Sequence, residues 1–122
     1  MQKLLKYLLN LIKIRSRRIL PAGGILITVP GASFDLFLSY ANSYYGFVDL
    51  SDLLHGDEIE IFEYLKPWNS RDFILHRSQK FNGPVGVPLV SFPLRTIDCP
   101  VKIVLKQNTG MRRNVWYSFK YD

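Results

Sequence analysis

Beyond residue 20, apolar residues tend to recur at every second position, the pattern of β-strands that bury one face. Glycine, proline and asparagine residues separate these stretches at roughly even intervals. The expected strands are 25–29, 34–40, part of 42–54, 57–65, 72–78, 89–92 (ended by Pro93), 101–106 and a last strand with Val115, Tyr117, Phe119 and Tyr121. The pattern predicts an all-β fold, an antiparallel β-sandwich of seven or eight strands with jelly-roll or immunoglobulin-like topology. A barrel is the alternative.

Two pairs of these segments are expected to form hairpins. Segments 57–65 and 72–78 flank a turn, and segment 101–106 is followed by a turn at 108–110 and the returning last strand. Apolar and acidic residues alternate from residue 57 until Phe62, where the phase shifts. This shift suggests a β-bulge or burial on both faces.

Residues 1–20 follow a different pattern. At 100° per residue, apolar side chains fill one broad arc as far as residue 14, and polar side chains fill the remainder. The side chains expected to contact a partner or a membrane are Leu4, Leu5, Leu8, Leu11 and Ile12, with Lys3, Lys6 and Lys13 beside them. The next position, Arg15, would fall inside the apolar arc, so the helix is expected to end near residue 14. The sequence thus predicts an N-terminal amphipathic basic helix and tether at 1–20 and a β-sandwich domain at 21–122.

The charge of the chain belongs to this first segment. The chain carries a net charge of +6, and the six unbalanced basic residues all lie before residue 19. A helix this short is not stable alone in water, so we expect it to fold against an apolar partner. The protein's own body or a neighbouring copy is the first candidate, and a membrane surface is the second. Nucleic acid is third, because the leucine face has no use there, although Arg15, Arg17 and Arg18 can contact phosphate or anionic lipid.

Candidate catalytic and metal-binding residues are few. The densest acidic group is Asp57, Glu58, Glu60 and Glu63. No further ligands accompany this group, so a solvated strand face is the simpler interpretation. Cys99, the single cysteine, excludes an intramolecular disulfide and is expected to be a buried or half-buried thiol. His55 and His76 are too far apart in sequence to argue for a catalytic pair, and His55 is expected at the surface. We therefore expect no enzyme activity, no cofactor and no metal.

Three further features bear on contacts. Trp68 lies in a predicted turn, where we expect either an interface anchor against a neighbouring subunit or packing against its own sheet. Trp116 is expected in the core or an interface, and Arg112 and Arg113 are expected to form a small basic patch at a hairpin tip. The longest uncharged run, 19–34, is broken by prolines and is too short to span a membrane.

Two stretches and the end of the chain resemble small β-sandwich proteins of viral particles. They are the segment 48–64 with its run Gly56-Asp57-Glu58-Ile59-Glu60, the segment 101–110, and the Tyr117-Ser118-Phe119 ending. The similarity covers about residues 25–122 and is closer to minor capsid or decoration proteins than to any enzyme family. It implies a jelly-roll-like domain that works through repeated subunit contacts, without catalytic residues.

Together these features predict a structural protein, a virion capsid or capsid-associated subunit. It is expected to self-associate through its β-sandwich, as a homo-oligomer or with neighbouring capsid subunits, and to be anchored by its N-terminal helix. The expected location is the virion, assembled in the host cytoplasm. The alternative is a membrane-peripheral β-sandwich binding module, held at the cytoplasmic face of a membrane by the basic amphipathic helix.

Overall fold

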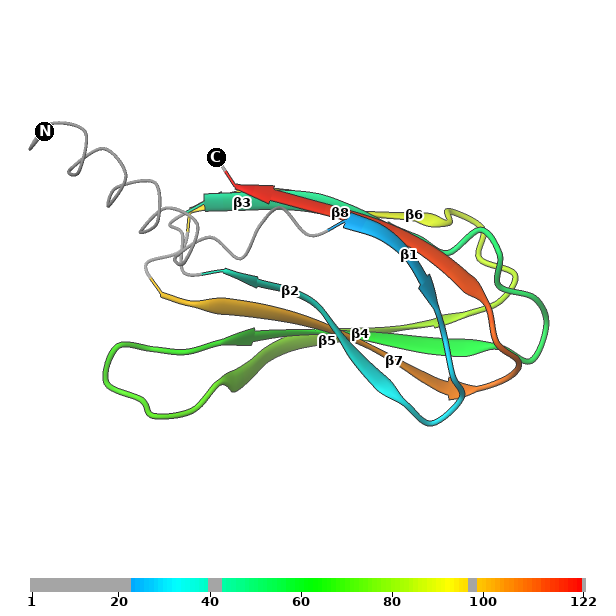
Figure 1. Ribbon diagram of the computed structural model, residues 1–122, viewed down its shortest axis with the longest axis horizontal. Coiled ribbons are helices and arrows are strands. Elements are labelled where there is room, and N and C mark those ends of the chain that lie inside the picture. The colour runs from blue at the N-terminus through cyan, green and yellow to red at the C-terminus, as the bar shows by residue number, and fades with distance from the viewer. Residues whose placement is uncertain (1–22, 40–42, 97–98, 122) are drawn as a thin grey trace, which may run out of the picture.

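Eight β-strands make up the described part of the chain in the computed structural model, which covers residues 23–39, 43–96 and 99–121 (Figure 1). They are β1 (Gly23–Ile27), β2 (Ser33–Ser39), β3 (Ser43–Asp49), β4 (Glu58–Leu65), β5 (Ile74–Asn82), β6 (Leu89–Thr96), β7 (Val101–Thr109) and β8 (Asn114–Tyr121). The all-β prediction of seven or eight strands is confirmed. The helix and tether expected over 1–20 lie outside the described residues.

The strands form two four-stranded antiparallel sheets, which lie one above the other in Figure 1. Sheet A has the order β1-β8-β3-β6, and sheet B has the order β2-β7-β4-β5. The first strand therefore pairs with the last, the second with the seventh, the third with the sixth and the fourth with the fifth. This nested pairing is the order of a jelly roll, which decides between the two sandwich topologies left open by the sequence.

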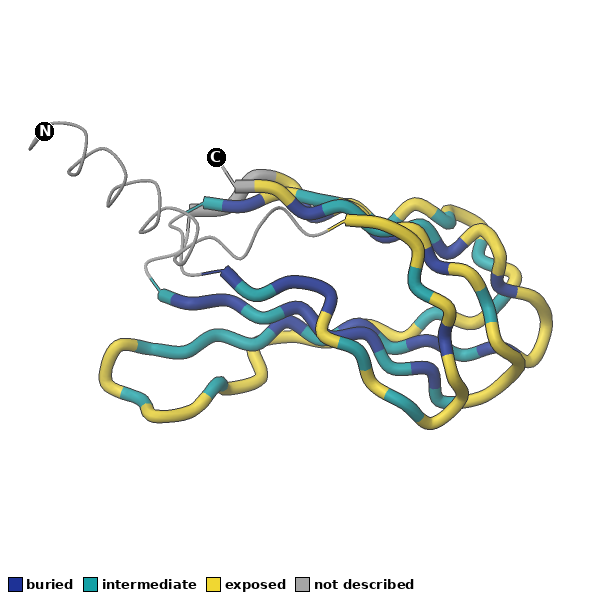
Figure 2. The backbone as a smooth tube through the Cα atoms, in the orientation of Figure 1, coloured by how far each residue is buried: buried dark blue, intermediate teal, exposed yellow. Residues whose placement is uncertain are grey.

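The core lies between the two sheets, where the buried stretches of each sheet face those of the other (Figure 2). Its centre is a chain of aromatic rings that crosses from one sheet to the other. Phe37 on β2 stacks on Phe119 of β8 with ring centres 5.1 Å apart, and Phe119 contacts Phe92 of β6 at 5.3 Å. Phe37 also lies 5.6 Å from Tyr44 on β3. Such pairs add attraction beyond the apolar area that they bury, so this cluster holds the sheets together.

Strand β4 explains the phase shift seen in the sequence at Phe62. Its side chains alternate without interruption, with Ile59, Ile61 and Glu63 facing the interior. The apolar pattern breaks because a carboxylate occupies the third inward position. The expected irregularity is present one residue further on, where the register with β5 shifts between Glu63 and Tyr64.

Two expectations about neighbouring strands are wrong. Strands β7 and β8 do not form a hairpin, because β7 pairs with β2 and β4 whereas β8 pairs with β1 and β3. The chain crosses between the sheets after Thr109, at Gly110, whose φ of 107° favours glycine. Pro93 does not end β6, because β6 is an edge strand and an edge tolerates a residue without an N–H.

Candidate functional site

At one end of the sandwich, the buried carboxylate of Asp57 joins several loops. It accepts hydrogen bonds from the backbone N–H of Leu54 (2.7 Å) and of Met111 (3.0 Å), and the Nε of Arg113 lies 2.5 Å from its Oδ2. The backbone carbonyl of Asp57 also accepts a hydrogen bond from the N–H of Gly83 (2.9 Å). The loops before β4, after β5 and after β7 therefore meet at one residue.

This environment keeps Asp57 ionised. Burial opposes ionisation, but the Leu54 N–H, the Arg113 guanidinium and the Met111 N–H outweigh it, so the pKa of Asp57 lies below its ordinary value. The side chains of Asp57 and Arg113 are only 1% and 16% exposed. These partners of the carboxylate all belong to the protein's own loops, so Asp57 stabilises the junction between them.

A second buried carboxylate, Glu63, lies between the two sheets. It accepts a hydrogen bond from the Tyr44 hydroxyl of sheet A, and its Oε1 is 3.0 Å from the Nε of Arg77 on β5. His76 Nε2 lies 3.9 Å from the same oxygen. The side chain of Glu63 is 2% exposed, whereas that of Arg77 is 46% exposed. The network therefore runs from the interior to the surface and joins the two sheets near one edge.

The two carboxylates correct the prediction that the acidic group is a solvated strand face. Glu58 and Glu60 do lie on the outer side of β4, but Asp57 and Glu63 are buried. Within residues 23–39, 43–96 and 99–121, no three His, Cys, Asp or Glu side chains come together as metal ligands would. The two buried carboxylates thus hold different parts of the fold: Asp57 joins loops, and Glu63 joins the two sheets.

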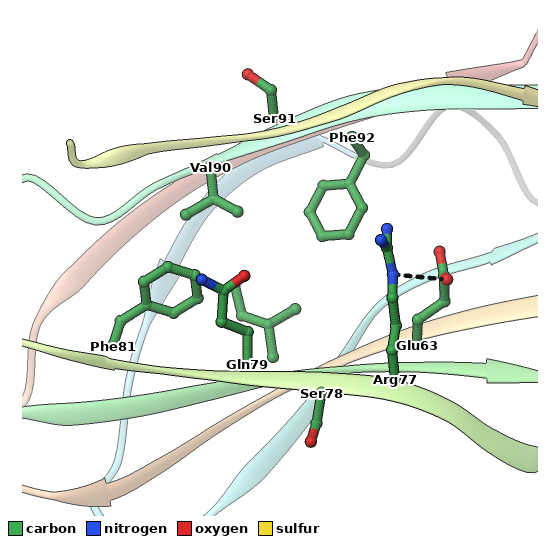
Figure 3. Close-up of a pocket in the computed structure, with 9 residues that line it drawn as sticks. Glu63, Arg77, Ser78, Gln79, Phe81, Val90, Ser91 and Phe92 are labelled. Carbon is green, nitrogen blue, oxygen red and sulfur yellow. Dashed lines mark ion pairs between the residues drawn. The ribbon is translucent and has the colours of Figure 1, made fainter.

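A cavity of about 130 Å³, here called the edge cleft, opens where the edge strands β5 and β6 face each other (Figure 3). Ile61, Phe81, Val90 and Phe92 provide its apolar walls, and Arg77, Glu63 and Gln79 provide its polar groups. In Figure 3, Val90 and Phe92 point down from β6, while Arg77 and Gln79 point up from β5. Ser78 and Ser91 point away from the cleft and border it with their backbone. The edge cleft therefore joins an apolar surface to a partly exposed guanidinium.

The outer face of sheet A is unusually apolar. Six large apolar side chains, each at least 38% exposed, are carried on it by all four strands. They are Ile25 and Ile27 on β1, Trp116 on β8, Tyr45 and Phe47 on β3, and Leu89 on β6. The cross-strand pairs place Ile25 opposite Trp116, and Trp116 and Leu89 on either side of Asp49. Exposed apolar side chains gathered in this way mark an interaction surface, and we call this set the apolar face.

The outer face of sheet B carries more charge, although Leu75 of β5, opposite Tyr64, is 50% exposed. Glu60 on β4 lies opposite Lys80 of β5 and Lys106 of β7, which is a favourable cross-strand arrangement of charges. Its aromatic residues are half-buried, and lysine covers them: Lys102 Nζ lies 5.2 Å from the ring centre of Tyr64 and 4.9 Å from that of Phe73. The two outer faces thus differ in chemistry, and sheet A carries the surface that suits a protein partner.

The structure places the other candidate residues as follows. Trp68 is 77% exposed in the β4–β5 loop, so packing against its own sheet is excluded and the role of interface anchor stays a prediction. Trp116 is 52% exposed, so the core position is wrong and the interface position remains. The basic patch at Arg112 and Arg113 is also wrong, because Arg113 is paired with Asp57. Cys99 is a half-buried free thiol, and His55 is exposed, both as expected.

The N-terminal candidates lie outside the described residues. These are Leu4, Leu5, Leu8, Leu11, Ile12, Lys3, Lys6, Lys13, Arg15, Arg17 and Arg18. Their contacts with protein, membrane or phosphate stay predictions. In the part of the chain that the structure describes, no helix has the length and apolar character needed to cross a membrane.

Comparison with known proteins gives one structural likeness to report. No family model and no curated protein sequence matches the chain. The crystal structure of the infectious bursal disease virus VP2 subviral particle is similar in fold, with a TM-score of 0.45 and 14% sequence identity. The match covers 81% of this chain and 28% of that chain, so this protein spans under a third of its length. The sequence predicted a weak resemblance to viral capsid proteins, and this neighbour is the chain of a virus particle.

Sequence reasoning missed both the apolar face and the edge cleft. The sequence did contain a sign of the apolar face. Tyr45, Phe47 and Trp116 are large apolar residues at positions that alternate with buried residues of the same strands. Only the strand order brings β1, β8, β3 and β6 side by side and so assembles these residues into one surface. The cleft depends on the edges of two sheets, which no local pattern in the sequence places together.

Proposed function

We propose that this protein is a structural subunit that associates with copies of itself through the apolar face. The observation that carries the proposal is the set of six exposed apolar side chains on the outer face of sheet A, in contrast to the charged face of sheet B. Water contact with such a surface is unfavourable by roughly 25 cal/mol for each Å². A second copy removes this cost for both partners at once.

Charge complementarity favours a two-fold arrangement of the two copies. The charged residues Asp49 on β3 and Lys120 on β8 lie among the apolar side chains. Asp49 pairs with Trp116 and Lys120 pairs with Tyr45, on opposite sides of the central pair Phe47 and Ser118. A two-fold axis in the plane between the faces, running across the strands, brings Asp49 of each copy toward Lys120 of the other. Two-fold contacts are self-complementary in this way and are the commonest in homo-oligomers.

The assembly that we propose is a virion shell or a shell-associated array, the setting indicated by the sequence resemblance. In this proposal, residues 1–20 have the anchoring role, through the apolar arc of the N-terminal segment. No cofactor or substrate takes part, and the function rests on contacts between subunits.

The test is to place a charge at the centre of the apolar face of the full-length protein. In Phe47→Asp, each copy loses one apolar contact of about 1.5–3 kcal/mol, and a two-fold interface counts this loss twice. We expect the dissociation constant to rise at least roughly 100-fold in sedimentation velocity or light scattering. The matched control is Ser33→Asp, which adds the same charge at an exposed strand position of sheet B. Equal association of Phe47→Asp and the unmodified protein would overturn the proposal.

Charge reversal tests the two-fold geometry separately. Asp49→Lys and Lys120→Asp should each weaken the dimer, because each places like charges opposite each other. The double variant should recover most of the lost affinity, since it restores both pairs with the charges exchanged. If the losses of dimer affinity of the two single variants simply add in the double variant, this arrangement is ruled out.

A further inference from the structure

Trp68 lies exposed on a turn whose hydrogen bonds do not involve the Trp68 side chain. The N–H of Ser70 donates to the carbonyl of Pro67 (2.8 Å), and the Ser70 Oγ accepts from the N–H of Asp72 (3.2 Å) and donates to the Asp72 carbonyl (2.9 Å). The β4–β5 loop extends beyond the end of the sandwich (Figure 2). An indole that is 77% exposed on a hydrogen-bonded turn has the properties of an interface anchor, because little conformational freedom is lost when it binds.

The edge cleft has room for one ring of an aromatic side chain. Its volume of about 130 Å³ is comparable to that of an engineered apolar cavity, about 150 Å³, that binds benzene. Phe81, Val90 and Phe92 line it from two strands of different sheets, so a ring placed there contacts apolar atoms on both sides.

The polar groups of the cleft favour a neutral aromatic guest. An anionic guest would approach the buried carboxylate of Glu63, and a cationic guest would approach the guanidinium of Arg77, whereas the two groups already balance each other at 3.0 Å. The side chain of Arg77 is 46% exposed, and its guanidinium can lie against the face of an incoming ring as a cation–π contact. Gln79, which points into the cleft from β5 in Figure 3, offers an amide oxygen to an indole N–H.

We propose that Trp68 of one copy inserts into the edge cleft of a second copy. This inference rests on the self-association proposed above and adds a second contact to it. The contact is heterologous, since a loop meets a cleft, and therefore repeats from subunit to subunit to form a ring or a chain. Combined with the two-fold contact of the apolar face, it supplies the two different interfaces from which a closed shell or an extended array is built.

The first experiment measures the mass of assemblies by light scattering on the full-length protein. The unmodified protein should form species larger than a dimer. Trp68→Ala should stop at the dimer, and Trp68→Phe, which keeps a ring, should retain larger species with affinity reduced by about ten-fold or less. Met111→Ala is the control, because Met111 is also a large exposed side chain on a loop, at 69% exposure. Larger species that persist unchanged in Trp68→Ala would overturn the inference.

The second experiment tests the cleft itself. Val90→Phe places an extra ring in the cleft and should also stop assembly at the dimer. As a measurement that does not depend on assembly, N-acetyltryptophanamide is added to the doubly substituted Trp68→Ala, Trp116→Phe protein, which contains no tryptophan, and the emission of the ligand is followed. Saturable binding with a shift to shorter wavelength is expected, with at least a ten-fold loss when Val90→Phe is added. Absence of saturable binding, or binding that Val90→Phe leaves unchanged, would overturn the cleft assignment.

The two proposals fail in different ways. If Phe47→Asp abolishes dimers while Trp68→Ala leaves the larger species intact, the apolar face is the interface and the loop-to-cleft contact is wrong. If the unmodified protein is a monomer at all concentrations, the proposed function fails, and the Trp68 contact between copies fails with it.

Discussion

The loop junction at Asp57 gives the sharpest prediction about stability. In Asp57→Asn the shape of the side chain is retained, but one oxygen becomes an NH₂ group. The Oδ2 position accepts from both Leu54 and Arg113, and the Oδ1 position accepts from Met111. The best orientation of the amide keeps its oxygen at the Oδ2 position and turns its NH₂ toward the Met111 N–H. One hydrogen bond is therefore lost, and Arg113 loses its charged partner.

The cost follows from burial of the pair. Removing one partner of a buried ion pair costs about 3–5 kcal/mol. Arg113 is 16% exposed and keeps some access to water, so we expect the lower end of this range, about 3 kcal/mol. For a domain of this size, that change corresponds to a drop in Tm of roughly 12 °C or more.

The assay is thermal and urea unfolding followed by circular dichroism at pH 7, with Asp35→Asn as the control. Asp35 is an exposed strand residue, so the same loss of charge should change the free energy of unfolding by less than about 0.5 kcal/mol. A destabilisation of Asp57→Asn below about 1 kcal/mol at pH 7 would refute the reasoning.

The same variant should show a characteristic pH dependence. Because the pKa of Asp57 is lower in the folded protein, its ionised form stabilises the fold fully above the unfolded pKa of about 3.9. This contribution is lost as the pH falls through the folded pKa. The gap in stability between the unmodified protein and Asp57→Asn should therefore narrow below about pH 4, and a gap that stays constant down to pH 2 would contradict the assignment.

Two further comparisons of variants test the interior. Gly46→Ala should cost about 1–3 kcal/mol in urea unfolding, because its new Cβ would overlap the Ser118 carbonyl and the Phe119 ring, whereas Gly86→Ala, where a Cβ meets open space, should be close to neutral. Glu63→Ala should destabilise by about 1–3 kcal/mol more than Glu63→Gln, because the glutamine retains an acceptor for the buried Tyr44 hydroxyl. Equal losses for the two Glu63 variants would show that this hydrogen bond contributes nothing.

The strands could be predicted because their signal is local. In β7, Val101, Ile103 and Leu105 are all buried, as their spacing at every second position predicts. Strand pairing could not be predicted in the same way. The sequence offered a hairpin between β7 and β8, yet the two strands join different sheets, because long-range pairing with β2, β4, β1 and β3 determines their positions.

The candidate site was harder to predict, because a charged residue can lie either at the surface or in a buried pair, and the sequence alone does not say which. Glu63 alternates with isoleucines in the inward phase, which is a sign of burial, but its charge argued for the surface. Its partner Arg77 lies on another strand, and Tyr44 lies on another sheet. Arg113 was assigned to the surface for the same reason. When a charged residue occupies an inward-facing position of a strand, it is better interpreted as one partner of a buried pair. The other partner comes from a different strand.

The edges of the sandwich bear on the proposed association through a face and a cleft. Exposed strand edges pair readily with other chains unless something protects them. Each of the four edge strands has such protection: β1 is short at five residues, β2 carries Asp35 beside a register shift, β5 carries the exposed cations Arg77 and Lys80, and β6 contains Pro93. Edge-to-edge pairing is therefore disfavoured on both sheets. The apolar face is less protected. Among its described side chains, Asp49 and Lys120 carry charge, and these two charges complement each other in the proposed two-fold pair. Protected edges together with one apolar face are what the proposed association through that face requires.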